Sequence, residues 1–254
     1  MIVIKNKHAI NKMRTAGNLL SGIFGEIEKT VVEGANTFEI DATIERLMKA
    51  AGLVPECKGY AGYRHATCIS VNDILIHGVP STRMVLKSGD FVTIDAVASY
   101  RGYCADMARC FFVGTPVEKA VEMAKVAQAA LDEAIKLVRP GIHLSDISAK
   151  IQSVVEAAGC NVVRDFVGHG VGKDLHEEPE IPNYGVPGEG PILQVGMTLA
   201  IEPMIAEKSA ETKILDDGWS VQIKDGGLAA HVEDTVCVTI DGVEVLTRNE
   251  QAYG

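Results

Sequence analysis

Four acidic residues lie inside segments that are otherwise apolar, where an ionised carboxylate is unfavourable. The four are Asp95, Asp106, Glu202 and Glu233. An isolated buried carboxylate costs on the order of several kcal/mol, so each of them must be neutral, paired or bound to a cation. A single acid of this kind is more often salt-bridged or at a strand edge than a ligand. Four together in four apolar segments predict a shared cation site.

The chain also resembles itself when it is shifted by 107 residues. The segment around Asp95 then aligns with the segment around Glu202, and Gly34 aligns with Gly141. Two copies are too few for a solenoid, which needs about three stacked repeats. Two similar halves that each deliver one carboxylate to a shared centre instead predict a symmetric metal site.

Asp95 and Asp106 lie in consecutive segments that are typical of a β-hairpin. If Tyr100 and Arg101 form its tip, Asp95 lies directly opposite Asp106. Like charges in that position repel each other unless a cation lies between them. The pattern therefore predicts a hairpin that presents both acids to a cation.

A histidine, His169, lies in the glycine-rich segment 168–172, where small residues let backbone and ligand approach closely. A lone histidine is usually structural or exposed, so this segment alone is a weak indication. With the four acids it makes a set of four carboxylates and one imidazole, whose charge of −4 matches two divalent cations. The mixed oxygen and nitrogen set suits Mn, Fe, Co or Zn better than Ca or Mg.

Sequence patterns along the chain predict the helices and strands that would position these residues. Apolar residues at helical spacing predict helices over 10–34, 36–51, 115–139 and 145–158. Asn36 is the expected N-cap of the second helix, and Thr115 with Pro116 the expected start of the third. β-branched segments predict strands over 91–98, 103–113, 197–205 and 231–240, with a surface loop over 177–192.

Helices followed by strands, twice over, predict an α/β (α+β) protein. We expect one domain, residues 1–254, with pseudo-symmetric halves at about 1–113 and 114–254. In the last predicted strand, period-2 alternation places His231 and Glu233 on the same face.

The overall composition excludes several classes of function. The chain has 254 residues, 47% of them hydrophobic, and a formal net charge of −10. Phosphate binding requires clustered Lys and Arg, which the sequence lacks, so no nucleic acid is expected as a partner. No stretch reaches the roughly 18 apolar residues of a membrane span, and residues 1–18 are too polar for a signal peptide. We therefore expect a cytoplasmic protein whose six cysteines are free thiols.

Short motifs around these residues resemble the type I methionine aminopeptidases, metallopeptidases of family M24 with the pita-bread fold. The motifs are His77-Gly78-Val79-Pro80, Ile94-Asp95, Ala105-Asp106, Gly168-His169-Gly170-Val171-Gly172, His176-Glu177-Glu178-Pro179, Ile201-Glu202-Pro203-Met204 and Glu233. The resemblance covers essentially the whole chain and implies a curved antiparallel sheet covered by helices. It also implies removal of the initiator methionine from nascent proteins when the second residue is small.

The resemblance further implies which residues bind two divalent metal ions. Asp95 and Asp106 would bind metal, Asp106 and Glu233 would bridge the two ions, and His169 and Glu202 would complete the first ion. All five positions hold a residue able to bind metal, so we expect an active metalloaminopeptidase.

The same resemblance assigns three catalytic roles. His176 would stabilise the developing oxyanion or orient the scissile carbonyl, and His77 would face the amide nitrogen. Glu202 would also carry a proton from water to the leaving amine. Without the resemblance, both histidines would be interpreted as surface-loop residues.

For the methionine side chain, the resemblance implies a pocket of thiol, aliphatic and aromatic groups. Its residues are Cys57, Tyr60, Tyr63, Cys68, Leu175 and Trp219, together with His77 and His176. Sulfur and aromatic groups suit a thioether, although alone these would be interpreted as ordinary core residues.

Several residues depart from the family pattern, among them Arg64-His65-Ala66 in place of a Pro-Lys-Ser-like stretch. Leu175 stands where Phe is common, His231 where Gln is usual and Asp234 where His is usual. If the alternation holds, His231 faces the metals and tunes Glu233.

Two other functions remain as alternatives. A non-catalytic pita-bread binding protein would typically have lost ligands, whereas all five are present here. An X-Pro aminopeptidase of the same fold would normally carry an additional N-terminal domain, whereas this chain starts almost directly at its first helix. The expected partners are the peptide N-termini of nascent proteins, at the ribosome, and the enzyme is expected to be a monomer that contacts no membrane.

Overall fold

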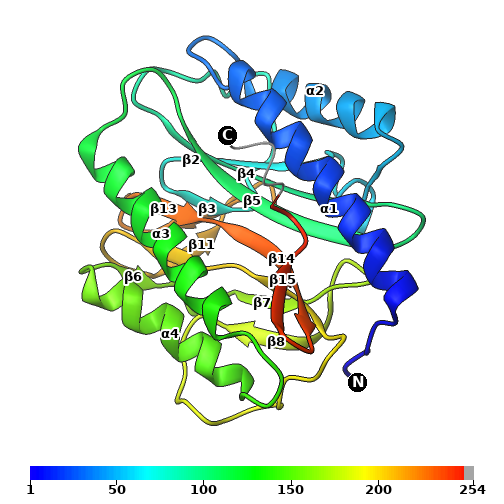
Figure 1. Ribbon diagram of the computed structural model, residues 1–254. Helices are drawn as coiled ribbons and strands as arrows, with labels where there is room; N and C mark the ends of the chain where they lie inside the picture. The colour runs from blue at the N-terminus through cyan, green and yellow to red at the C-terminus, as the bar shows by residue number, and fades with distance from the viewer. Residues whose placement is uncertain (249–254) are drawn as a thin grey trace.

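The computed structural model describes residues 1–248. Its helices are α1 (Lys7–Ile27), η1 (Glu28–Thr30), α2 (Thr37–Ala50), η2 (Tyr60–Gly62), α3 (Glu118–Leu137) and α4 (Leu144–Ala157). Its strands are β1 (Val54–Pro55), β2 (Cys68–Val71), β3 (Ile74–Ile76), β4 (Phe91–Ser99), β5 (Cys104–Phe112), β6 (Asn161–Val162), β7 (Val167–Gly170), β8 (Glu177–Pro182), β9 (Thr198–Ile201), β10 (Met204–Ala206), β11 (Thr212–Ile214), β12 (Val221–Ile223), β13 (Ala229–His231), β14 (Glu233–Thr239) and β15 (Gly242–Val245). Figure 1 shows α1 and α3 crossing in front of the strands, with α2 near α1 and α4 beside α3.

One large antiparallel sheet runs through both halves of the chain. Its strand order is β1–β4–β5–β14–β9–β7–β8, with β2 on β4 and β15 on β14. Two three-stranded sheets, β13–β10–β6 and β11–β12–β3, complete the structure. The two halves meet where β5 pairs with β14, which places their acidic residues on neighbouring strands.

The 107-residue offset of the sequence recurs in the backbone. Shifting α2 by this offset gives the bounds of α4, and both helices have 14 residues. The isolated bridge between Asn36 and Val85 likewise becomes the bridge between His143 and Ile192. Strand β4 becomes β9 and β10 together. Both halves therefore share one backbone plan.

The predicted starts of two helices have different outcomes. Asn36 caps α2 as predicted, because its side chain accepts a hydrogen bond of 2.9 Å from the backbone N–H of Glu39. The predicted cap of α3 is wrong, because the helix begins at Glu118 and Val117 is its N-cap. The backbone N–H of Thr115 instead donates to the Ser88 side chain.

The predicted register of the β4–β5 hairpin is also wrong. Arg101 and Gly102 form the tip, with φ of 51° and 74°, as a type I′ turn requires. Asp95 consequently pairs with Ala108 rather than with Asp106. Because the error is two residues and side chains alternate with period 2, both acids still lie on the same face.

Four further segments differ from the predicted ones. The first helix ends at Ile27, and a 3₁₀ turn follows it. The predicted loop over 177–192 begins as strand β8, which pairs with β7. The predicted strands over 197–205 and 231–240 are each interrupted, because Pro203 cannot donate to a ladder and Val232 separates β13 from β14.

Each half contributes its own hydrophobic core. Leu20 of α1 and Ile44 of α2 pack with apolar residues of β4 and β5. Leu131 of α3 and Ile151 of α4 pack with those of β9 and β14. The helices thus pack against the sheet through these apolar residues.

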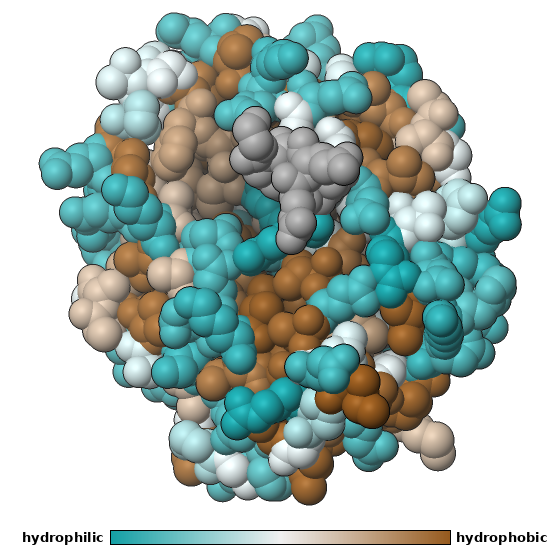
Figure 2. All heavy atoms as spheres, in the orientation of Figure 1, coloured by the Kyte–Doolittle hydropathy of each residue, from teal (hydrophilic) through white to brown (hydrophobic). Residues whose placement is uncertain are grey.

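The outer surface is polar, with apolar residues scattered over it. On the face drawn in Figure 2, hydrophilic residues dominate, and apolar side chains gather where Figure 1 places β14 and β15. No helix among residues 1–248 has the length and the apolar run needed to cross a bilayer. All six cysteines are free, as predicted.

Candidate metal centre and substrate pocket

All the residues that the sequence predicts for the site line one cavity of about 570 Å³. They are Cys57, Tyr60, Tyr63, Cys68, His77, Asp95, Asp106, His169, Leu175, His176, Glu202, Trp219 and Glu233. They come from strands and loops of both halves, so the tertiary fold brings distant segments to one place.

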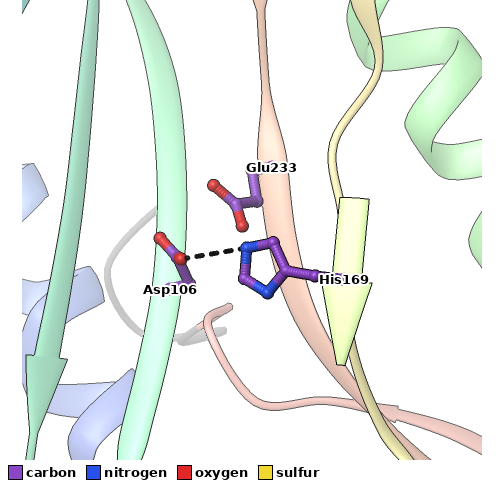
Figure 3. Close-up of side chains that lie close together, drawn as sticks. All are labelled: Asp106, His169 and Glu233. Atoms are coloured by element: carbon purple, nitrogen blue, oxygen red, sulfur yellow. Dashed lines mark ion pairs between the residues drawn. The ribbon is translucent and has the colours of Figure 1, made fainter. Parts of the chain in front are cut away.

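Asp106, His169 and Glu233 form a buried cluster in this cavity. They come from β5, β7 and β14, and Figure 3 shows their side chains pointing toward one another. One ligand atom of each lies within 4.8 Å of the other two. His169 Nε2 is 3.7 Å from Asp106 Oδ2. This spacing suits donor atoms that share a cation.

Glu202 lies between two histidines. Its Oε1 is 3.4 Å from His169 Nε2, and its Oε2 is 3.3 Å from His231 Nε2. His231 Nε2 is also 3.8 Å from Glu233 Oε2. Glu202, His231 and Glu233 therefore form a second group of close ligand atoms. The structure places His231 against Glu202 as well as against Glu233, the residue it was expected to face.

Glycines let the histidine strand approach its neighbours. A Cβ added to Gly168 would lie 2.6 Å from the carbonyl oxygen of Ala200 and 3.3 Å from Glu202 Cγ. One added to Gly170 would collide with the backbone of Glu178. The glycine-rich segment around His169 is thus required for the close approach of β7 to β8 and β9.

Burial raises the pKa of all four carboxyl groups. It raises the pKa of Asp95 to about 6, and the pKa values of Asp106, Glu202 and Glu233 rise well above their ordinary range. Among residues 1–248, Asp106 Oδ1 and Glu233 Oε1 are buried without a hydrogen-bond partner. Crowded acids with unpartnered oxygens form the donor set that divalent cations would neutralise.

His169 is held in the form that binds metal. Its Nδ1–H donates to the carbonyl oxygen of Gly170 at 2.9 Å, which leaves the Nε2 lone pair directed toward the acids. Burial lowers the pKa of His169 to about 4, so the ring is neutral near pH 7.

Two more histidines border the cavity. His77 has a left-handed backbone, with φ of 57°, and burial lowers its pKa to about 4. Strained backbone of this kind tends to occur at functional sites. His176 packs edge-on against His169, with ring centroids 4.4 Å apart, and its Nδ1 lies 2.9 Å from the Tyr60 hydroxyl. Both rings are held in place beside the acids.

The rest of the cavity is an apolar pocket. Tyr63 and Trp219 meet at an angle, with ring centroids 5.0 Å apart, and the Tyr63 hydroxyl donates to the Thr67 carbonyl at 3.0 Å. Cys57 and Cys68 are buried beside them, and Leu175 packs in the same cluster. The wall is therefore sulfur, aliphatic and aromatic in character.

Asp234, which departs from the family pattern, joins a buried network behind the site. Its carboxylate accepts hydrogen bonds from Arg109 at 2.6 Å, from Arg248 at 2.7 Å and from Thr247 at 2.8 Å. Arg109 also donates to the carbonyl oxygen of Glu233 at 2.5 Å. The network thus fixes the backbone that carries Glu233.

Several cavity residues were missed at the sequence level. Val97 lines the cavity because it lies two residues beyond Asp95 on the same strand face, a relation that the alternation predicts. Phe166 packs edge-on against His77 at 6.1 Å between ring centroids, and no local pattern indicates it. Exposed acids, including Glu178 and Glu180, form an acidic rim.

Comparison with known proteins agrees with this geometry. Residues 11–240 match the sequence pattern of metallopeptidase family M24. The chain belongs to metallopeptidase family M24. The methionine aminopeptidase A of Synechocystis sp. is 43% identical to this M24 chain over 249 residues, which cover 98% of both proteins.

Solved structures confirm the expected pita-bread fold of this M24 enzyme. The crystal structure of methionine aminopeptidase from Thermotoga maritima matches it with a TM-score of 0.96 and 43% identity, covering 98% of this chain and 100% of the other. The prolidase from Pyrococcus furiosus matches with a TM-score of 0.80 and 27% identity, and the match covers 98% of this chain and 66% of the prolidase. As an M24 metallopeptidase, the protein is a hydrolase that uses divalent metal.

Proposed function

We propose that this enzyme removes N-terminal methionine from peptides. The proposal rests on one observation: a single cavity is lined by five side chains of types that can bind metal and by an apolar pocket of sulfur and aromatic groups. Full-length similarity to methionine aminopeptidases supports it. The natural substrates would be nascent proteins with a small second residue, met at the ribosome by a monomeric cytoplasmic enzyme.

Asp95, Asp106, His169, Glu202 and Glu233 would hold two divalent ions, drawn from Co, Mn, Fe and Zn. Their four carboxylates balance the charge of such a pair, and the unpartnered oxygens of Asp106 and Glu233 support this role. Bound divalent ions polarise a scissile carbonyl and lower the pKa of water.

Glu202 is the side chain suited to moving a proton. It is buried, and burial raises its pKa in the absence of metal; its carboxylate would accept a proton from water. The same group would then deliver that proton to the leaving amine. One of its oxygens lies beside His169 and the other beside His231.

His176 and His77 would position the peptide bond. Burial lowers the pKa of both histidines, so both rings would be neutral, each with one nitrogen that donates and one that accepts a hydrogen bond. His176 would donate to the carbonyl oxygen as charge develops there, and His77 would face the amide nitrogen. Their contacts with Tyr60 and Phe166 hold these directions.

The apolar pocket would select the methionine side chain. Aromatic rings at Tyr63 and Trp219, and the Cys57 and Cys68 thiols, suit a thioether. The acidic rim would attract the ammonium group of the peptide terminus. Leu175 would contact the side chain in place of the Phe common at that position.

A panel of peptides tests this proposal. We expect the metal-loaded enzyme to release methionine from Met-Ala-Ser, more slowly from a peptide with a bulky second residue, and to leave Ala-Pro peptides intact. Cleavage of Ala-Pro without methionine release would favour the X-Pro aminopeptidase. No cleavage with any divalent metal would favour the non-catalytic binding protein.

A variant of the proton carrier tests the mechanism. Glu202→Gln keeps the shape of the side chain but cannot carry the proton, so turnover should fall by at least about 10²-fold. The exposed loop residue Glu189 provides the matched control, and Glu189→Gln should keep full activity. Normal turnover in folded Glu202→Gln would refute the role of Glu202.

A further inference from the structure

His231 occupies a place that the family ligand set leaves unassigned. It ends β13, pairs with Met204 of β10 and is 2% exposed. Its carbonyl oxygen accepts a hydrogen bond from the Cys110 thiol at 3.5 Å. The backbone therefore holds this ring near two acids. Glu202 directly follows the end of β9, and Glu233 is the first residue of β14.

The ring of His231 makes no hydrogen bond that explains its burial. Among residues 1–248, both Nδ1 and Nε2 are buried without a partner. Nε2 is 3.3 Å from Glu202 Oε2 and 3.8 Å from Glu233 Oε2, yet it is not aligned to donate to either oxygen. An unsatisfied polar atom in a native core calls for a bound water, an ion or a functional role.

These distances match donor atoms that surround one cation. Two ligands bound to a tetrahedral metal at about 2.1 Å lie about 3.4 Å from each other. The His231–Glu202 distance is close to that value, as is the 3.4 Å between His169 Nε2 and the other oxygen of Glu202. The two imidazoles thus face opposite oxygens of one carboxylate.

We propose that His231 is a sixth metal-binding side chain, which presents Nε2 to a cation held with Glu202 and Glu233. The inference rests on the metal site of the proposed function. It gives the enzyme two imidazole ligands where the family pattern supplies one. Nitrogen donors suit Zn, Co and Fe, whereas Mn and Mg prefer sites made mostly of oxygen. The departure at His231 would therefore shift the metal preference away from Mn.

Nuclear magnetic resonance of the full chain tests the proposal directly. The protein labelled with ¹⁵N at histidine is titrated with Zn²⁺, and the ring nitrogens of His169, His231 and His77 are followed. We expect metal-bound nitrogen signals from His169 and His231 and an unchanged ring at His77. Signals from His169 alone would overturn the inference and leave the proposed function intact. No metal-bound signal from either ring would overturn the inference and the metal site together.

Calorimetric metal binding provides a second readout that needs no turnover. His231→Gln restores the usual family residue, and should weaken Zn²⁺ binding by at least about tenfold and Mn²⁺ binding by less. His77→Asn, which tolerates the left-handed backbone, is the matched control and should bind Zn²⁺ normally. Equal Zn²⁺ affinity of His231→Gln and the wild type would contradict the proposal. If His231→Gln does not fold, His231→Asn replaces it in the calorimetry. The ¹⁵N-histidine spectra of the wild type then decide whether His231 binds Zn²⁺.

Discussion

The hydroxyl of Tyr60 lies 2.9 Å from Nδ1 of His176, beside the candidate metal ligand His169. When this hydroxyl donates to Nδ1, the single proton of the neutral imidazole lies on Nε2. His176 can then donate a hydrogen bond to a substrate carbonyl, as its proposed role requires. In the proposed mechanism, Tyr60 would thus link the substrate pocket to the scissile peptide bond through His176.

Tyr60→Phe should remove this constraint without changing the shape of the pocket. A hydrogen bond worth about 1 kcal/mol predicts a loss of roughly fivefold to tenfold in kcat, with little change in KM. Steady-state release of methionine measures both constants. Tyr103→Phe, outside the cavity, is the control. A larger effect on KM than on kcat would instead show that Tyr60 mainly binds substrate.

The buried ion pair between Lys5 and Glu177 should anchor the segment that carries His176. The Lys5 side chain is 3% exposed, and its Nζ is 2.5 Å from Glu177 Oε2. Lys5→Met leaves a largely buried carboxylate unpaired, so the free energy of unfolding should fall by about 3 kcal/mol. Urea denaturation measures the change.

The surface pair of Lys136 and Glu133 provides the control for that variant. Its side chains are 68% and 45% exposed, so Lys136→Met should leave the free energy of unfolding essentially unchanged. If Lys5→Met were as stable as Lys136→Met, the buried pair would have no anchoring role.

Asp95 should make the metal-free protein less stable as pH rises. Its pKa in the folded protein is about 6, above the ordinary value near 4. The folded state therefore binds more protons than the unfolded state between about pH 4 and 6, and stability falls across that window. Urea denaturation in chelator should show a smaller fall for Asp95→Asn.

Divalent metal should reverse this pH dependence, because it binds the ionised carboxylates and its affinity rises with pH. Chelated wild type and Asp95→Asn with parallel pH profiles between 4 and 6 would contradict the prediction for Asp95.

Leu175 should contribute to side-chain selection. It packs in the apolar cluster with Cys57, Tyr63 and Trp219, so Leu175→Ala enlarges the pocket. We expect kcat/KM for Met-Ala-Ser to fall by at least about tenfold, while the relative rate on Phe-Ala-Ser rises. Unchanged selectivity in a competition assay of the two peptides would show that Leu175 does not contact the side chain.

The four acids and His169 were predictable because their signals are local, whereas His77, His176 and the pocket residues came from the family resemblance. Acids such as Asp95 interrupt apolar strands, and His169 is flanked by glycines that allow close approach. The hairpin register was wrong by two residues because Arg101 adopts a positive φ that its residue type does not indicate. Strand alternation nevertheless preserved the shared face of the two acids.

Relations between distant segments were not predictable in the same way. The contact of His231 with Glu202 depends on the pairing of β13 with β10, and that of Phe166 with His77 on the packing of two loops. The bonds of Asp234 to Arg109 and Arg248 are also long-range. Such contacts are set by tertiary packing, which no periodicity in the chain encodes.

The most direct test of the account is a metal titration of methionine release. Metal-free protein is mixed with Met-Ala-Ser, and free methionine is measured as Co²⁺, Mn²⁺, Fe²⁺ or Zn²⁺ is added. We predict no release in chelator and release that rises with added ion. Full release by the chelated protein, or none with any ion, would contradict the central claim that this cavity is a metal-dependent methionine aminopeptidase site.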